Sequence, residues 1–485
     1  MNHFFNYLYP SLFLTSFAAT VVFSSLTFLY FFLPLSIVFY FAFKNIRVQN
    51  FILLAFSFIF YAWGEPVWVI LLLFSGLLDY FNGLLIDKFQ ENKTVRLVAL
   101  LNSIVINLGL LATFKYADFI IQNTNFLLGT SFTEPNILLP VGISFYTFQT
   151  LSYTIDVYKG EVKAEKDPID FLMFVSLFPQ LVAGPIVRYA EVAAQTRVRP
   201  FDWSSVATGV NRFCLGLFKK VVLANSVGIL VEKYLQVQFY DLSTPEAWFG
   251  IVLYSLQLYF DFSGYSDMAI GLGRIFGFTF PENFRHPYAA TSVANFYQRW
   301  HMTLGRFLRD YVYIPLGGNK KHQIRNILVV WFLTGLWHGA SWNFVLWGLF
   351  LGVFMVIEKV LKKYFDLLPR FALYAYALLV VNFSRSFFYF DDFEKLGIFL
   401  GKLFYSPNYI GAGWGSDLAS YAFLYVVVIL FCIPWDEIFP KSSRTNEVAS
   451  RYYRGFSLGI NLLFLLLATA LIVDDTYNPF IYFRF

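Results

Sequence analysis

Residues 326–356, NILVVWFLTGLWHGASWNFVLWGLFLGVFMV, contain no Asp, Glu, Lys or Arg and hold a single histidine, His338. Basic residues flank both ends of this run: Lys320, Lys321 and Arg325 precede it, and Lys359, Lys362 and Lys363 follow it. Lys and Arg in short loops mark the cytoplasmic side of a membrane, so both ends are expected on one side. The chain must then enter the membrane and return, and the small residues Gly339-Ala340-Ser341 predict the turn.

The whole chain has the composition of a membrane protein. It is 485 residues long, with 58% hydrophobic and 14% charged positions, against roughly 45–50% and about 25% in soluble proteins. Further charge-free runs occupy the first 43 residues and positions 97–114, 171–187, 418–435 and 456–473. Each is near the ~20 residues that cross a hydrocarbon core. This excludes a soluble enzyme, a disulfide scaffold and a disordered chain. It predicts an all-α, polytopic helical membrane protein with about eleven to thirteen hydrophobic segments, some of them re-entrant or tilted.

No Ser- or Gly-rich linker and no repeat interrupts the chain, which predicts a single multi-pass membrane domain over residues 1–485 with a catalytic core at about 171–360. The first apolar run is interpreted as membrane-spanning rather than as a cleaved signal. Two spans that turn at Glu65-Pro66 between basic loops predict an in–out–in hairpin, and the aromatic segment 480–485 is expected at the outer interface.

Several other classes of site are excluded. The net charge of +5 is small and the basic residues form short clusters, so no nucleic-acid partner is expected. Cys214 and Cys432 lie alone in apolar surroundings, without the spacing of a disulfide, zinc or redox motif. No metal-ligand spacing accompanies a histidine, so no metal site is predicted.

Two carboxylates, Asp261 and Asp267, interrupt an apolar segment. Acidic groups at membrane depth usually face a polar interior, which would make them the wall of a cavity. The alternative is structural, because the surrounding small residues allow helices to pack closely.

Residues 295–319 alternate basic and apolar positions at helical spacing, which predicts an amphipathic basic helix in the membrane interface. Arg299 and Arg306 then have two interpretations. They anchor the chain to lipid headgroups, or they receive the phosphates of an anionic cytosolic donor.

His338 is the main candidate for a catalytic group. At 1.5 Å per helical residue it lies roughly 18 Å past Asn326, more than halfway across the core. An imidazole there is costly unless it has a function, although a lone histidine can also be structural. His301 lies in a second apolar-rich segment. One histidine could deprotonate a hydroxyl while the second polar group orients it or the substrate.

Six stretches resemble the membrane-bound O-acyltransferase family, and within it the bacterial alginate O-acetyltransferase branch. They are Val22–Leu35 (VFSSLTFLYFFLPL), Phe178–Arg188 (FPQLVAGPIVR), Gly216–Val222 (GLFKKVV), Tyr259–Ala269 (YFDFSGYSDMA) and the two most specific ones, Phe296–Leu304 (FYQRWHMTL) and Leu333–Asn343 (LTGLWHGASWN). The resemblance covers nearly the whole chain. It departs locally at Arg385-Ser-Phe-Phe-Tyr389, where relatives often have Trp-x-Phe-Phe-Arg.

The resemblance implies that His338 is the catalytic histidine, that His301 occupies the second conserved position of the family, and that the helices surround a central funnel. It implies acyl transfer from a cytosolic thioester, with acetyl-CoA the expected donor and no permanently bound cofactor, to a hydroxyl outside the cytoplasm. His338 would act as general base. The expected substrate-binding residues are Arg299, Trp300, Arg306, Trp337, Ser341 and Asn343.

The expected acceptor is an exopolysaccharide or cell-wall polymer such as alginate, and the expected location is the inner (plasma) membrane. The segments expected outside, such as 407–417, are only about a dozen residues long, too short to hold a polymer. A secreted or membrane-anchored esterase-fold partner is therefore expected. Three alternatives remain: a D-alanyl transferase acting on teichoic acid, a small-molecule transporter, and a structural scaffold of an export complex.

Overall fold

The computed structural model describes residues 22–411, 413–438 and 447–474. These residues form helices joined by turns and loops, with no β-strand among them, which confirms the all-α prediction. The prediction that the aromatic segment 480–485 lies at the outer interface falls outside the described residues, as do the first 21 residues of the first apolar run.

The chain divides into two compact units. The first comprises residues 1–210 and 268–280, and the second comprises 211–267 and 281–485. Each unit is considered by itself below. The prediction of one domain over the whole chain stays a prediction, and all the residues that concern the candidate site belong to the second unit.

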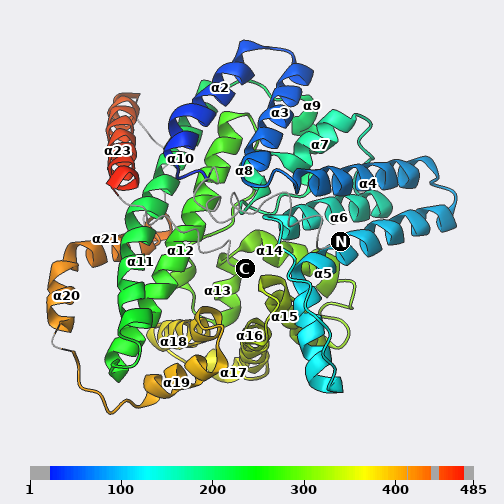
Figure 1. Cartoon of the computed structure of the whole chain (residues 1–485). Coiled ribbons are helices and arrows are strands. Elements are labelled where there is room, and N and C mark those ends of the chain that lie inside the picture. The colour runs from blue at the N-terminus through cyan, green and yellow to red at the C-terminus, as the bar shows by residue number, and fades with distance from the viewer. Residues whose placement is uncertain (1–21, 412, 439–446, 475–485) are drawn as a thin grey trace. The chain divides into compact units, whose positions relative to one another are not determined.

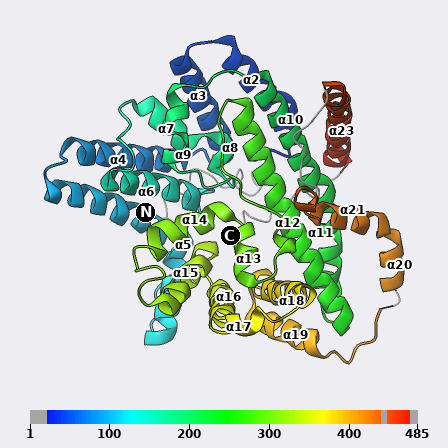
Figure 2. The ribbon, with the colours of Figure 1, turned by 180° about the vertical axis from the view of Figure 1, so that it is seen from behind.

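The first unit begins with a helical hairpin at the predicted position. Its helices are η2 (Phe28–Phe32), α2 (Leu33–Ala42), α3 (Ile46–Gly64), α4 (Val69–Lys88), α5 (Lys93–Leu128), α6 (Ile143–Lys159), α7 (Pro168–Ser176), α8 (Phe178–Leu181) and α9 (Tyr189–Arg197). Helix α3 ends at Gly64 and α4 begins at Val69, which confirms a break at Glu65-Pro66, while the in–out–in course of the two helices stays a prediction. Helix α4 packs against both α5 and α6 (Figures 1 and 2). The buried Asp79 of α4 accepts a hydrogen bond of 2.8 Å from Asn107 of α5.

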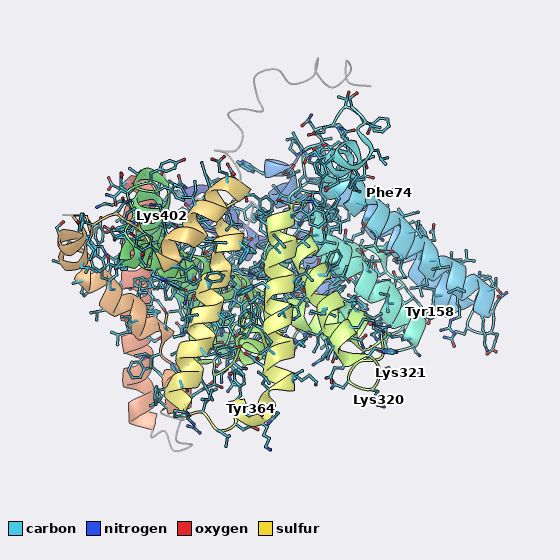
Figure 3. All side chains as sticks on the ribbon, turned by 90° about the horizontal axis from the view of Figure 1, so that it is seen from below. Phe74, Tyr158, Lys320, Lys321, Tyr364 and Lys402 are labelled. Carbon is cyan, nitrogen blue, oxygen red and sulfur yellow. The ribbon has the colours of Figure 1, made fainter. Side chains whose placement is uncertain are left out.

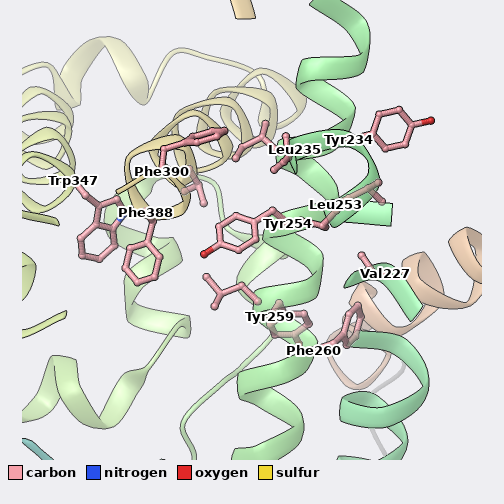
Figure 4. Packing of buried hydrophobic residues seen from close by; sticks show 14 of the residues in the cluster. Val227, Tyr234, Leu235, Leu253, Tyr254, Tyr259, Phe260, Trp347, Phe388 and Phe390 are labelled. Carbon is pink, nitrogen blue, oxygen red and sulfur yellow. The ribbon is translucent and has the colours of Figure 1, made fainter. Parts of the chain in front are cut away.

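Two long helices, α10 (Trp203–Phe218) and α12 (Thr244–Ile275), contribute residues to both units. The second unit also contains η3 (Lys219–Ala224), α11 (Asn225–Glu232), η4 (Lys233–Val237), η5 (Pro287–Ala289), α13 (Val293–Arg299), α14 (Met302–Leu308), η6 (Arg309–Tyr313), α15 (Gln323–His338), α16 (Trp342–Val360), α17 (Lys362–Phe365), α18 (Arg370–Tyr389), α19 (Phe393–Phe404), α20 (Trp414–Ser420), α21 (Ala422–Cys432), α22 (Trp435–Ile438) and α23 (Glu447–Asp474). Aromatic and aliphatic side chains of these helices form its core (Figure 4).

The two aspartates of α12 have structural partners. Asp261 forms an ion pair of 2.9 Å with Lys220, and both side chains are at most 2% exposed. Asp267 accepts from Arg212 and from Lys219, each at 2.7 Å. These contacts join α12 to α10 and η3, which favours the structural interpretation of the two carboxylates over a cavity wall.

Helices α15 and α16 form a tightly packed antiparallel hairpin, as predicted for residues 326–356. The turn was predicted at Gly339-Ala340-Ser341. The structure confirms it, since α15 ends at His338 and α16 begins at Trp342. A Cβ atom added at Gly348 would lie 2.2 Å from the carbonyl oxygen of Trp331, and one at Gly335 would lie 2.4 Å from that of Phe344. Small residues at these positions let the two backbones approach closely.

Seven helices of the described residues are long and apolar enough to cross a membrane, or eight if the bent pair α20–α21 is one span. This is fewer than the hydrophobic segments of the sequence, because several apolar segments form shorter helices. The open ends of the α15–α16 hairpin lie at one edge of the second unit, where Figure 3 shows Lys320, Lys321 and Tyr364 together. That placement agrees with the expectation that both basic flanks share one side, and the sidedness itself stays a prediction.

Candidate active site

His338 lies at the point where the hairpin turns. It is the last residue of α15, and the next residue, Gly339, is extended with φ −170° and ψ 153°. The imidazole is 6% exposed. Its ring centroid is 5.0 Å from that of Trp347 on α16 and 5.1 Å from that of Phe388 on α18. Figure 4 shows these two aromatic side chains side by side. Three helices therefore fix the position of the histidine.

His301 lies at a second break. The sequence predicted one amphipathic basic helix within residues 295–319, and that prediction is wrong because the helix is broken at His301. Helix α13 ends at Arg299, and α14 begins only at Met302. Between them His301 adopts the left-handed conformation, with φ 46° and ψ 52°, which is uncommon for residues other than glycine but is enriched for Asn, Asp and His. The break turns the imidazole into the protein, where it is 3% exposed.

The hydrogen bonds of Asn283 determine which nitrogen of His301 carries the proton. Asn283 Oδ1 lies 3.0 Å from His301 Nδ1 and accepts from the Thr303 hydroxyl at 2.9 Å and from the Thr303 backbone N–H at 3.3 Å. A backbone N–H can only donate, so the Asn283 atom is the oxygen, and His301 Nδ1 must be the donor. Burial lowers the pKa of His301 to about 3. The ring is therefore neutral at pH 7, and its basic nitrogen is Nε2.

Both histidines line one cavity of the second unit. Its volume is about 240 Å³. The other lining side chains are mostly apolar or aromatic and include Trp300, Tyr297, Trp331, Trp347, Arg385 and Phe388. The structure thus brings together two histidines that lie 37 positions apart in the sequence, and an arginine from a third helical segment. A largely apolar cavity with a few polar groups suits proton transfer.

The predicted substrate-binding residues divide into two groups. Trp300 lines the cavity, and the ring of Trp337 lies 5.7 Å from that of His301 and 4.8 Å from that of His338. The remaining four do not line the cavity: Arg299, Arg306, Ser341 and Asn343. Their role in substrate binding stays a prediction.

Each of these four side chains lies outside the cavity lining, in surroundings of its own. Arg299 forms an ion pair of 3.0 Å with Glu437, and Arg306 donates to the carbonyl of Glu282 at 3.3 Å. Ser341 is the N-cap residue of α16. Asn343 is fully buried and donates to the carbonyl of Phe387 at 3.1 Å, so it links α16 to α18.

The sequence analysis did not identify Trp347, Arg385 or Phe388 as site residues. Trp347 and Phe388 look like ordinary core positions of apolar helices. Arg385 was visible in the sequence as one basic residue in the apolar segment 371–390, and an ionisable residue in such a segment is a functional candidate by default. Only the packing of α18 against α13 and α16 shows that it lines the same cavity as the histidines.

Comparison with known proteins identifies the family of this chain. Residues 164–391, which contain both histidines and Arg385, match the model of the membrane-bound O-acyltransferase family. A "probable alginate O-acetylase" from Pseudomonas putida is 35% identical over 96% of this chain and 100% of its own length. A "peptidoglycan O-acetyltransferase" from Helicobacter pylori is 35% identical over 77% of this chain and 78% of its own. A "teichoic acid D-alanyltransferase" from Bacillus subtilis is 30% identical over 47% and 62%.

The chain belongs to the membrane-bound O-acyltransferase family. It is a multi-pass membrane enzyme that uses an acyl donor. This decides against the transporter and the scaffold, the two alternatives that are not acyltransferases.

Proposed function

We propose that this enzyme transfers an acetyl group from acetyl-CoA, on the cytoplasmic side of the inner membrane, to a hydroxyl presented from the other side, for O-acetylation of an exopolysaccharide or cell-wall polymer such as alginate. The enclosure of His338 and His301 in one small cavity is the observation that carries this proposal. The names of the Pseudomonas and Helicobacter relatives support acetyl as the acyl group and a polymer as the acceptor.

In the proposed mechanism His338 takes the proton of the acceptor hydroxyl as the oxygen attacks the thioester carbonyl carbon. The carbon–sulfur bond then breaks, and the thiolate receives the proton from His338. General-base catalysis of this kind contributes typically ~10²–10⁴-fold. The neutral His301, held by Asn283, orients the substrate or His338. The aromatic walls keep water from the reacting groups.

The test compares two histidine variants of the same helix in proteoliposomes with labelled acetyl-CoA. We expect His338→Asn to abolish label transfer while the protein still inserts and folds. The matched control is His322→Asn, because His322 is exposed, begins the same helix and has a left-handed backbone that Asn tolerates. Normal transfer by His338→Asn would refute the assignment.

The identity of the acyl donor distinguishes this proposal from the remaining alternative, a D-alanyl transferase. A D-alanyl transferase would take its acyl group from a carrier-protein thioester, as the more distant Bacillus relative suggests. Transfer from a D-alanyl carrier protein, with none from acetyl-CoA, would favour that alternative.

We also propose that an esterase-fold partner outside the cytoplasm completes the reaction. The cavity of about 240 Å³ has no room for several sugars, so the acetyl group would pass through an intermediary. The purified enzyme should then acetylate free polymer poorly until the partner is added. Efficient acetylation without a partner would contradict the relay.

A further inference from the structure

Arg385 places a permanent positive charge in the wall of the histidine cavity. The residue belongs to α18 and is 1% exposed. Its guanidinium carbon lies 4.5 Å from the ring centroid of Trp300 and 6.0 Å from that of Phe296. Trp300 is the neighbour of His301 in the chain. Phe388, one helical turn after Arg385, packs on His338. The guanidinium and both imidazoles therefore line the same cavity.

This buried charge lacks the partners that other buried cations of the same unit have. Lys220 pairs with Asp261 and Arg212 pairs with Asp267. Among the described residues Arg385 forms no ion pair, and its Nε and Nη2 atoms, both buried, have no hydrogen-bond partner. An arginine keeps its charge in proteins, and a buried charge without a partner is strongly destabilising. Aromatic stacking offsets only part of that cost.

The size and lining of the cavity restrict what could neutralise this charge. Ligand pockets usually measure about 300–1,000 Å³, so about 240 Å³ holds the reacting ends of two substrates rather than a nucleotide or a sugar chain. Arg385 is the one Lys, Arg, Asp or Glu among the described lining residues. Attack on a thioester carbonyl forms a tetrahedral intermediate, in which the former carbonyl oxygen carries a negative charge. This oxyanion would form inside the cavity and could neutralise the charge of Arg385.

We propose that Arg385 donates hydrogen bonds to the carbonyl oxygen of the acyl group and stabilises the oxyanion of the tetrahedral intermediate. The proposal rests on the function proposed above. As the acceptor oxygen bonds to the carbonyl carbon, the π electron pair moves onto the carbonyl oxygen, which faces the guanidinium. When the carbon–sulfur bond breaks, the pair returns to re-form the carbonyl, and Arg385 keeps its protons throughout. Donors that bind the charge more strongly than the neutral carbonyl accelerate the chemical step.

The test uses Arg385→Met and Arg385→Lys, with Arg370→Met as the matched control, because Arg370 is exposed at the start of the same helix. The assay follows the release of free thiol from acetyl-CoA in proteoliposomes to which the extracytoplasmic partner has been added, with an uncharged oligosaccharide and with a uronate oligosaccharide as acceptors. We expect Arg385→Met to lower kcat about 10²–10³-fold with either acceptor, the loss typical of one missing oxyanion donor. The KM for acetyl-CoA should change little, and Arg385→Lys should recover part of kcat.

Thermal unfolding separates this role from a structural one. Since the charge has no protein partner, Arg385→Met should unfold at the same Tm as the wild type or higher. A lower Tm that Arg385→Lys restores together with full activity would overturn the proposal in favour of a structural role. A loss confined to the uronate acceptor and seen in its KM would overturn it in favour of carboxylate binding. If wild-type enzyme releases no thiol, the proposed function fails, whereas an unchanged kcat in Arg385→Met beside an active wild type refutes only the role of Arg385.

Discussion

Replacing Gly348 with alanine should separate α15 from α16 and displace His338, the proposed general base. A Cβ atom at this position would lie 2.2 Å from the backbone oxygen of Trp331, while ordinary contacts begin at 3.4 Å. The obstacle is backbone, flanked by Gly335 at 3.1 Å, so no side chain can rotate away. The helices must move apart by roughly 1 Å, a displacement that can reduce a rate about 10²-fold when it reaches the reacting groups. Overpacking of this kind also lowers stability, typically by about 1–3 kcal/mol.

Gly397→Ala is the matched control for this variant. Gly397 lies on α19 of the same unit, and nothing lies within 4 Å of the position of its Cβ atom. Alanine there should leave activity unchanged and add up to about 1 kcal/mol of helix stability. The assays are thiol release from acetyl-CoA and thermal unfolding in detergent. Wild-type activity and Tm in Gly348→Ala would refute the idea that close backbone packing positions His338.

Three further predictions concern the second unit. Asp261→Asn should destabilise the protein by about 3–5 kcal/mol in thermal or denaturant unfolding, because Lys220 would be left buried without its counter-charge; a change below ~1 kcal/mol would contradict this. Burial lowers the pKa of His301 to about 3 in the folded protein, against ~6.5 in the unfolded chain. The free energy of unfolding should therefore be independent of this residue above pH ~6.5 and should decrease as the pH falls from ~6.5 toward 3, because only the unfolded state binds the proton in that range. Wild-type protein should therefore lose about 2 kcal/mol more between pH 7.5 and 5 than His301→Asn does, and parallel pH profiles would argue against a neutral buried ring. In a cysteine-free background, Lys321→Cys and Lys362→Cys should both resist impermeant maleimide applied outside intact cells, since both flanks of the hairpin are basic; rapid labelling of either would place the hairpin the other way round.

The sequence alone determined the class of the protein and the break at His338. Uninterrupted apolar runs can be stable only as helices in a membrane, because every backbone polar group must be satisfied within the segment. The same local physics predicted the α3–α4 hairpin at Glu65-Pro66 and the α15–α16 turn at Gly339–Ser341, where small residues follow an apolar helix.

Only the tertiary structure decided which side chains surround the histidine. The helical break at His301 depends on Asn283, which fixes the ring from 18 positions earlier in the chain, and no periodicity reveals such a contact. The basic spacing of Arg299 and Arg306 suggested donor contacts, yet Arg299 pairs with Glu437 and Arg306 donates to the carbonyl of Glu282. For Arg385 the sequence showed one charged residue in an apolar helix but suggested no role. The packing of α18 on α13 and α16 shows that this residue lines the cavity. A pattern along one helix gives its buried face, but which buried faces meet is set by long-range packing.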